Sequence, residues 1–242
     1  MTNLLIIKVG DAFPEVVRDY GDFETLFQQA LTAEGFTASV FDPRTGAPLP
    51  DPATIDGLII TGSHSMVSER EPWSEALQPW LRDARARDVA MLGVCYGHQL
   101  MAAAFGGHVD FHPEGRESGT LAVRLTETGR ADALLGTLPE RFYAHLTHAQ
   151  SVLEAPSDAQ VLAFNDHDAN QALRYGPRQW SVQFHPEFTP EVMRAYLERQ
   201  REVLSDLGRD PQKLIDEVAM TPEATGLLTS FAGRVFNPAS ST

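Results

Sequence analysis

One segment constrains the fold more than any other. An apolar run at residues 89–94 leads directly into Gly-Val-Cys-Tyr-Gly at 93–97, and a helix-compatible stretch, Leu-Met-Ala-Ala-Ala-Phe at 100–105, follows. Glycines two positions on either side of a residue permit a sharp, strained turn from a strand into a helix. The turn lifts the central residue out of the sheet. The segment therefore predicts a strand–turn–helix unit that presents the Cys95 thiol over the start of the helix.

The first hundred residues alternate between strand-like and helix-like patterns. Strands are expected at 4–9, 37–41, 58–60 and 89–94, and helices at 23–31 and 73–87. Asp22 is placed to cap the first helix and Gly35 to end it. This alternation predicts right-handed crossovers and a mostly parallel sheet with helices on both faces. Ligands of such sheets bind at the carboxyl ends of the strands, where the loops at Gly10, Gly62 and Cys95 are expected.

The second half of the chain has a different pattern. Shorter, closer strands are expected at 120–125, 160–164, 171–175 and 180–184, which predicts a mixed or antiparallel extension of the sheet. Helices are expected at 190–207, 211–219 and 222–231, with a frayed tail at 237–242. The predicted architecture is a three-layer α/β fold with a central, mostly parallel sheet, flanking helices and a C-terminal helical extension. We divide it into a domain over 1–190 and an extension over 191–242 that packs on the same domain.

Composition excludes several function classes. The formal net charge is −14 and the pI about 4.9, so phosphate backbones and anionic membrane surfaces are repelled. No run approaches the roughly 20 apolar residues of a membrane span, and the N-terminus does not resemble a signal peptide. The single cysteine forms no intrachain disulfide and no cysteine-rich zinc site. We therefore expect a cytoplasmic protein that binds neither nucleic acid nor membrane.

Cys95 has the surroundings of a nucleophile. Unpaired N–H groups and the dipole at a helix N-terminus favour the thiolate over the thiol. The N–H of Tyr96 is then placed to bind an oxyanion. The alternative is that Cys95 is a small core residue, as most free cysteines are. The flanking glycines and the strand-to-helix context favour the nucleophile.

A base and a group that orients it follow in Gln-Trp-Ser-Val-Gln-Phe-His-Pro-Glu at 179–187. Large apolar side chains alternate with polar ones, so His185 is expected at a strand end, facing away from them. Pro186 cannot donate to a strand ladder and should end the strand. Because residues two apart project to the same side of an extended segment, Glu187 can reach one imidazole nitrogen of His185. A thiolate nucleophile needs such a pair.

The other histidines are weaker candidates. His98 follows the turn too closely to fold back on Cys95, and neither the segment with His145 and His148 nor that with His108 and His112 has an adjacent acid in register. No four-ligand metal set, phosphate-binding loop or dinucleotide fingerprint is evident. We therefore expect no metal and no cofactor.

At this point the residues resemble a known family. Gly93-x-Cys95-x-Gly97-x-Gln99, followed far downstream by His185-Pro186-Glu187, is similar to the motifs of class I (triad-type) glutamine amidotransferases. The resemblance covers about residues 4–190. It implies a flavodoxin-like three-layer fold and attack of the cysteine on the side-chain amide of glutamine, which releases ammonia and leaves a γ-glutamyl thioester for hydrolysis. By overall resemblance, which includes the Gly10-Asp11 region and the helical extension, the chain looks like the stand-alone branch near the amidotransferase domain of GMP synthase. That branch also resembles the γ-glutamyl peptidases.

The resemblance also implies roles for single residues. Cys95 would be the nucleophile, His185 the base and then the acid, and Glu187 the orienting group. The oxyanion hole would comprise Gly62, Ser63 and Tyr96, and the substrate would be bound by Gln99, Thr147 and His148. Three positions depart from the family pattern. Ser63 and His64 stand where the family usually has glycine and proline, and Gln150 stands where an acid is common.

Several functions remain open at this point. The first is release of ammonia from glutamine, with or without a synthase partner that consumes it; nothing in the 242 residues can be that synthase. The second keeps the thioester and changes the substrate to a γ-glutamyl peptide or amine. A non-catalytic binding or regulatory protein with the same fold would have lost the three catalytic residues, all of which are present. A last alternative is a cysteine hydrolase or chaperone-like protein with a similar turn. Such a protein would not explain why a His-Pro-Glu motif follows far downstream of Cys95.

Overall fold

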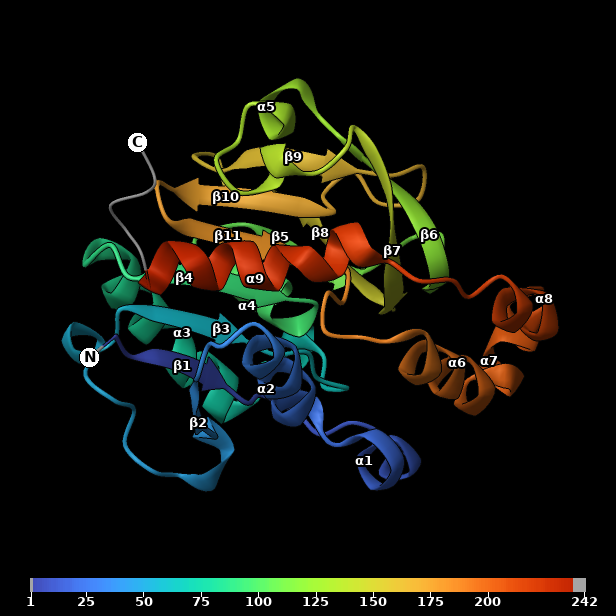
Figure 1. Cartoon of the computed structure of the whole chain (residues 1–242), viewed down its shortest axis with the longest axis horizontal. Helices are drawn as coiled ribbons and strands as arrows, with labels where there is room; N and C mark the ends of the chain where they lie inside the picture. Colours follow the sequence, from blue (N-terminus) through green and yellow to red (C-terminus); the bar gives the residue numbers. More distant parts are fainter. Residues whose placement is uncertain (1, 237–242) are drawn as a thin grey trace.

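The computed structural model describes residues 2–236, and within them a nine-stranded sheet forms the centre of the molecule (Figure 1). Its strand order is β2-β1-β3-β4-β11-β10-β9-β6-β7. The strands are β1 (Leu4–Ile7), β2 (Ser39–Phe41), β3 (Gly57–Ile60), β4 (Ala90–Val94), β6 (Glu117–Leu125), β7 (Arg141–His148), β9 (Gln160–Phe164), β10 (Ala172–Gly176) and β11 (Gln179–Val182). A separate two-stranded sheet pairs β5 (His108–Phe111) with β8 (Gln150–Glu154).

The sheet has a parallel half and an antiparallel half. β2, β1, β3, β4 and β11 pair in parallel, and β10, β9, β6 and β7 continue the sheet with antiparallel pairs. β11 lies beside β4 in register, with Val182 opposite Val94. The segments that follow these two strands, which carry Cys95 and His185, therefore leave the same edge of the sheet side by side.

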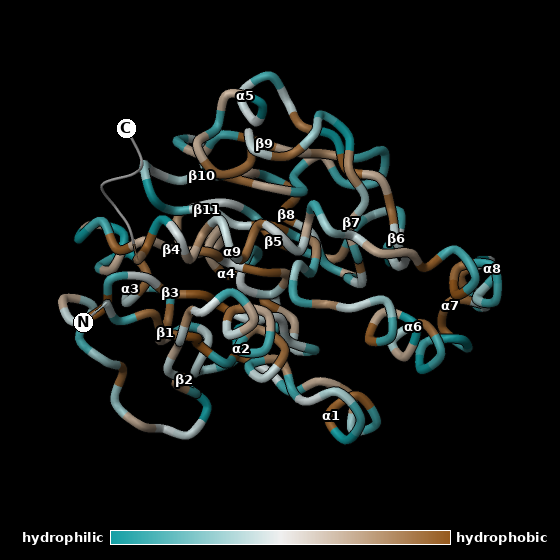
Figure 2. Tube along the Cα trace, in the orientation of Figure 1, coloured by the Kyte–Doolittle hydropathy of each residue, from teal (hydrophilic) through white to brown (hydrophobic). Residues whose placement is uncertain are grey.

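Helices cover both faces of the sheet. On one face, α3 (Pro72–Ala86) and α4 (Tyr96–Ala104) bury Leu81 and Leu100. On the other face, α2 (Phe23–Ala33) and α9 (Pro222–Phe236) bury Phe27 and Phe231. In Figure 2 the hydrophobic colour follows β1 and β3 in the middle of the fold. The predicted three-layer, mostly parallel α/β fold with C-terminal helices is confirmed.

A third group of elements lies at one end of the sheet (Figure 1). α1 (Pro14–Tyr20), α6 (Pro190–Arg199), α7 (Arg201–Asp206) and α8 (Pro211–Asp216) share a small core around Val16, Met193 and Leu204. The remaining short elements are α5 (Glu127–Arg130) and 3-10 helices at Pro43–Thr45, Pro52–Thr54, Val67–Glu69 and Leu135–Thr137. No helix of the described chain is both long and apolar enough to cross a membrane.

The single helix predicted over 190–207 is wrong, because it is interrupted at Gln200. The Gln200 side chain bonds to Thr147 of β7, with its Nε2 3.1 Å from the Thr147 Oγ1. This contact lies between distant parts of the chain, and no glycine or proline marks the break. The strands β5, β7 and β8 and the helix α1 are also not among the predicted elements. The expected tail at 237–242 lies outside the described residues, and the division at residue 190 stays a prediction.

Candidate active site

Cys95 stands at the turn between β4 and α4, in a strained conformation. Its φ is 52° and its ψ −101°, values that a residue with a Cβ rarely adopts. Its backbone N–H donates to the carbonyl of Val182 at 2.9 Å, and its own carbonyl accepts from the N–H of Gln99 at 3.1 Å. The backbone on both sides of the turn is thus held by β11 and by the first turn of α4.

The two flanking glycines are needed for close packing. A Cβ at Gly93 would lie 2.5 Å from the carbonyl oxygen of Gly97, and a Cβ at Gly97 would lie 2.5 Å from the carbonyl oxygen of Ile60. Neither glycine has a positive φ, so the strain of the turn falls on Cys95 itself. The glycines let α4 start directly against β3 and β4, which places the thiol above the sheet edge.

His185 and Glu187 form a buried pair beside the turn. The Nδ1 of His185 lies 2.7 Å from the Oε1 of Glu187, and the two side chains are 2% and 0% exposed. β11 ends at Val182, earlier than the predicted end at 184, and the His185 backbone N–H donates to the carbonyl of His145 at 2.9 Å. Phe188 stacks on the imidazole with ring centroids 4.1 Å apart. The ring is therefore fixed from three sides, and its Nε2 is left without a partner among the described residues.

The thiol and the imidazole shift each other's proton affinity. Burial opposes the charged thiolate, yet the charge of His185 lowers the pKa of Cys95 below its ordinary value. Burial likewise opposes the imidazolium, but the charges of Glu187 and Cys95 raise the pKa of His185. Both shifts favour a thiolate–imidazolium pair between Cys95 and His185.

The loop after β3 packs against this pair. A Cβ at Gly62 would lie 3.1 Å from the Cε1 of His185, so the backbone passes close to the imidazole. The Thr61 hydroxyl accepts from the N–H of Val9 at 3.1 Å and donates to the carbonyl of Gly62 at 3.0 Å. That bond holds the Gly62–Ser63 peptide, and therefore the direction of the Ser63 N–H.

His64, which stands in place of the family's proline, links this loop to the C-terminal helices. Its ring stacks on Phe13 with centroids 4.2 Å apart. Its Nε2 lies 3.2 Å from the hydroxyl of Tyr196 on α6. No local pattern predicts this contact, because Tyr196 is far from the loop along the chain.

Gln99 and Thr147 both lie beside Cys95 with their side chains hydrogen-bonded. Gln99 donates through its Nε2 to the carbonyl of Gln150 at 2.7 Å and to the Oε1 of Gln183 at 3.0 Å. Thr147, near the end of β7, bonds to Gln200. These bonds fix one wall of the site through β7, β8 and the α6–α7 junction.

The expectation that His148 has no acid in register is wrong. Glu117 pairs with His148 across β6 and β7, and its Oε2 lies 2.9 Å from the His148 Nε2. The other ring nitrogen, Nδ1, lies 2.9 Å from the carbonyl oxygen of Gln150. Both nitrogens thus face acceptors, an arrangement that suits the doubly protonated ring. Burial opposes that charge, but the bond to Glu117 prevails and raises the pKa of His148.

A cavity of about 140 Å³ opens onto Cys95. Of the predicted site residues, Cys95, Ser63, Gln99, Thr147 and His148 line it, whereas His185, Glu187, Gly62 and Tyr96 are not among its lining residues. The additional lining residues include Phe13, His64, Arg116, Gln150, Tyr196 and Gln200. Within residues 2–236 no three His, Cys, Asp or Glu side chains are grouped to hold a metal ion.

The sequence of this chain is similar to one known protein family and to several individual proteins. Residues 16–202 match the model of the glutamine amidotransferase class-I family. The chain is 32% identical to a glutamine-hydrolyzing GMP synthase subunit of Methanothrix thermoacetophila over 71% of this chain and 87% of that protein. It is 25% identical to gamma-glutamyl peptidase 5 of Arabidopsis thaliana, over 76% of this chain and 75% of that protein.

The fold has close structural neighbours. A crystal structure of a glutamine amidotransferase from Thermotoga maritima superposes with a TM-score of 0.77 at 19% identity, covering 98% of this chain and 99% of that one. At 19% identity this structural similarity supports the fold alone. The sequence match over residues 16–202 establishes the family. The chain belongs to the class-I glutamine amidotransferase family.

Proposed function

We propose that this protein hydrolyses the side-chain amide of glutamine through a γ-glutamyl thioester on Cys95. The observation that carries the proposal is the strained turn at Cys95 together with the buried His185–Glu187 pair, whose imidazole charge lowers the pKa of the thiol. A cysteine nucleophile, an imidazole and a group that orients the imidazole are the parts that amide hydrolysis by a thiol requires. The lowered pKa of Cys95 supports a thiolate as the attacking species.

The proposed reaction has two halves. The Cys95 thiolate forms a bond to the amide carbon, and the carbon–nitrogen bond breaks as protonated His185 gives its proton to the departing nitrogen, which leaves as ammonia. In the second half His185 removes a proton from water, the water oxygen attacks the thioester carbon, and the carbon–sulfur bond breaks. Glutamate leaves, and the thiolate–imidazolium pair is restored. Glu187 holds the ring orientation and balances its charge in both halves.

Each half of the reaction passes through an oxyanion, which is stabilised by hydrogen-bond donors. The N–H of Tyr96, at the first position of α4, has no acceptor within the helix and is the first proposed donor. The loop at Gly62 and Ser63 supplies the second. Since the Thr61 hydroxyl holds the Gly62 carbonyl, we propose that the Ser63 N–H is preset and that no peptide flip precedes the reaction.

The remaining predicted residues would bind the substrate. Gln99, Thr147 and His148 line the cavity, and their hydrogen bonds hold their side chains in place. Similarity to a glutamine-hydrolyzing subunit of GMP synthase supports a synthase partner that consumes the ammonia, which we retain as part of the proposal.

A second candidate is hydrolysis of γ-glutamyl peptides or amines by the same thioester. The cavity is bordered by the loop residues Ser63, Ser65 and Met66, all partly exposed, so it opens toward solvent near Cys95. An open cavity accepts a leaving group larger than ammonia. Similarity to a gamma-glutamyl peptidase favours the same interpretation.

One experiment separates the candidates. The purified chain is incubated with L-glutamine, with γ-glutamyl-p-nitroanilide and with glutathione, and released glutamate is measured by mass spectrometry against the Cys95→Ala variant. Glutamate from glutamine supports the first candidate, and release from the conjugates alone supports the second. If none of the three yields glutamate above the variant, the chain by itself is not the hydrolase that we propose. A partner-activated amidotransferase subunit or a non-catalytic protein would then be the better description, and labelling of Cys95 by a glutamine analogue separates these two.

A further inference from the structure

The catalytic cavity contains an arginine that has no carboxylate partner within residues 2–236. Arg116 immediately precedes β6 and lines the cavity together with Cys95. Within the described part of the chain it forms no salt bridge, and its one side-chain hydrogen bond runs from Nη1 to the hydroxyl of Thr147 at 3.4 Å. By contrast, Arg44 contacts two carboxylates, those of Asp11 and Asp42.

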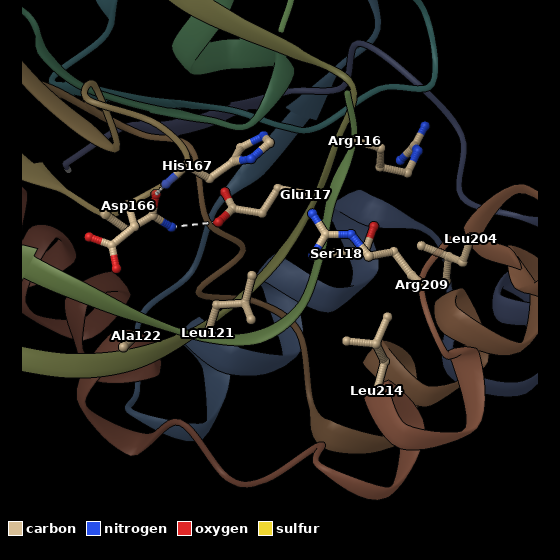
Figure 3. A pocket seen from close by; sticks show the side chains of 11 residues that line it. Arg116, Glu117, Ser118, Leu121, Ala122, Asp166, His167, Leu204, Arg209 and Leu214 are labelled. Atoms are coloured by element: carbon tan, nitrogen blue, oxygen red, sulfur yellow. Dashed lines mark hydrogen bonds between the residues drawn. The ribbon is translucent and has the colours of Figure 1, made fainter. Parts of the chain in front are cut away.

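The nearest carboxylate along the chain is unable to pair with Arg116. Glu117 is the next residue, and successive side chains of an extended strand point to opposite sides. Figure 3 shows Glu117 pointing toward the segment with Asp166 and His167, and Arg116 on the other side of the strand. The Glu117 carboxylate already accepts hydrogen bonds from His148, Asn165 and Gln171.

An uncompensated guanidinium in a partly buried site is costly unless a ligand supplies the anion. Burial lowers the pKa of Arg116, although an arginine remains protonated under any ordinary condition. Of the other ionisable groups that line the cavity, His148 has a raised pKa and is paired with Glu117, while burial lowers the pKa of His64. Cys95 also faces Arg116, and its charge opposes the effect of burial on the pKa of Arg116. This wall of the cavity therefore presents positive charge, in a protein whose net charge is −14.

We propose that Arg116 binds the α-carboxylate of the γ-glutamyl substrate. The inference rests on the proposed function, which places the γ-carbonyl of the substrate at Cys95. Cys95, Thr147 and Arg116 line one cavity of about 140 Å³, and the charge of Cys95 acts on the Arg116 guanidinium, so one ligand in this cavity faces both groups. A planar guanidinium matches a carboxylate with two parallel hydrogen bonds. The site then selects free γ-glutamyl amino acids and their conjugates over glutamine side chains within proteins, which lack a free α-carboxylate.

A second cavity provides a matched control. Arg116 also borders a neighbouring hollow of about 290 Å³, which Arg209 enters from the α7–α8 loop beside Ser118 (Figure 3). Arg209 likewise has no salt bridge within residues 2–236, but it does not line the catalytic cavity. Arg209→Gln thus removes an unpaired arginine close to the site without touching the proposed carboxylate contact.

The test uses ligands with and without the α-carboxylate. Alkylation of Cys95 by iodoacetamide is followed in the intact chain while L-glutamate, L-glutamine or 4-aminobutanamide (glutamine without its carboxylate) protects the thiol. In Arg116→Gln we expect the concentrations of L-glutamate and L-glutamine that give half-protection to rise roughly 10- to 100-fold. A change of this size corresponds to the loss of a charge-assisted hydrogen bond. We expect no change for 4-aminobutanamide, partial recovery in Arg116→Lys, and unchanged protection in Arg209→Gln.

Turnover gives a parallel readout. In Arg116→Gln the KM for L-glutamine and for γ-glutamyl-p-nitroanilide should rise by the same factor, because both carry the α-carboxylate, while kcat changes little. If Arg116→Gln weakened protection by 4-aminobutanamide as much as protection by L-glutamate, or left both unchanged, the carboxylate assignment would be overturned. Since protection needs no turnover, a chain that failed to hydrolyse any substrate would contradict the proposed function and still report on Arg116.

Discussion

The backbone of Cys95 is strained in the conformation that places its thiol at the turn. Its φ of 52° belongs to a region that costs of order 1–3 kcal/mol for a residue other than glycine. The strain persists because β4, β11 and α4 fix the backbone on both sides. It leaves the thiol next to the imidazole without a change of conformation before reaction, and this preorganisation is the link between local structure and the proposed chemistry.

Cys95→Ala should abolish hydrolysis and leave the fold intact. Alanine fits the same space and keeps the same backbone bonds, whereas no other cysteine exists to replace the thiol. We expect turnover to fall at least about 10³-fold, and the free energy of unfolding to change by less than about 1 kcal/mol. Glutamate release and urea denaturation measure the two quantities. Full activity in this variant would exclude the proposed nucleophile.

Loss of the base should cost more than loss of the group that orients it. His185→Ala removes the proton carrier, whereas Glu187→Gln keeps a hydrogen-bond acceptor near the ring and removes only charge. We expect kcat/KM for Glu187→Gln to exceed that of His185→Ala by about one to two orders of magnitude. The reverse order in steady-state assays would mean that His185 does not carry the proton.

The Glu187→Gln substitution should shift the pH dependence of kcat/KM toward lower pH on its alkaline side. The Glu187 charge helps to raise the pKa of His185 against the effect of burial, so its removal lowers that pKa. Protonated His185 is needed for the leaving nitrogen, and its loss limits the rate on the alkaline side. The alkaline limb of kcat/KM should therefore shift to lower pH. An unmoved or upward-shifted limb would show that the limb reports another group.

The individual site residues differ in how far sequence can identify them. Cys95, His185 and Glu187 stand in two short motifs whose spacing along the chain already implies their contacts. Arg116, Glu117 and Gln200 reach the site through the β6–β7 register and the α6–α7 break, which depend on contacts between distant segments. No local pattern marks them, so sequence reasoning misses them.

At the scale of the elements, the start of α4 depends on a residue without a side chain. Gly97→Ala would put a Cβ 2.5 Å from the carbonyl oxygen of Ile60, so α4 or β3 would have to move. We expect a loss of about 1–3 kcal/mol in the free energy of unfolding and a marked fall in activity. Urea denaturation and glutamate release measure these two effects.

Gly226→Ala is the matched control for that substitution. Gly226 lies inside α9, and a Cβ there meets nothing within 4 Å. Alanine favours the helix, so this variant should gain about 0.5–1 kcal/mol and keep full activity. Equal destabilisation by the two substitutions would contradict the packing explanation for Gly97.

The elements that sequence predicts are those with a strong local pattern. The apolar runs of β1, β3 and β4 and the one-sided helix α2 are located to within a few residues. β7 is not among the predicted strands, although Phe142, Ala144 and Leu146 alternate with polar residues and form a usable signal. The division of the predicted 190–207 helix has no local signal, because the Gln200 side chain is held by Thr147.

At the scale of the whole molecule, the C-terminal helices are part of the structure that supports the site. Tyr196 and Gln200 line the catalytic cavity, while Leu227, Leu228 and Phe231 of α9 are buried in the core beneath β7 and α2. Burial of each large apolar side chain contributes about 1.5–3 kcal/mol, and a protein of this kind is stable by about 5–15 kcal/mol in total. The fold therefore depends on these helices.

Phe231→Ala should accordingly destabilise the whole molecule. Phe231 is fully buried and packs against Trp180 of β11, with ring centroids 6.4 Å apart. We expect a loss of about 3–5 kcal/mol in urea denaturation, monitored by tryptophan fluorescence. Met220→Ala, at a side chain that is 72% exposed, should change stability by less than about 0.5 kcal/mol. Similar values for the two variants would show that α9 is not an integral part of the core.

The most direct test of the central claim is to trap the acyl-enzyme. The protein is mixed with L-glutamine or γ-glutamyl-p-nitroanilide, quenched in acid within milliseconds to seconds, and digested for peptide mass spectrometry. We predict one γ-glutamyl group, attached by a thioester to the peptide that contains Cys95 and absent from Cys95→Ala. Rapid glutamate release without any adduct on Cys95, or an adduct on another residue, would contradict the proposed mechanism.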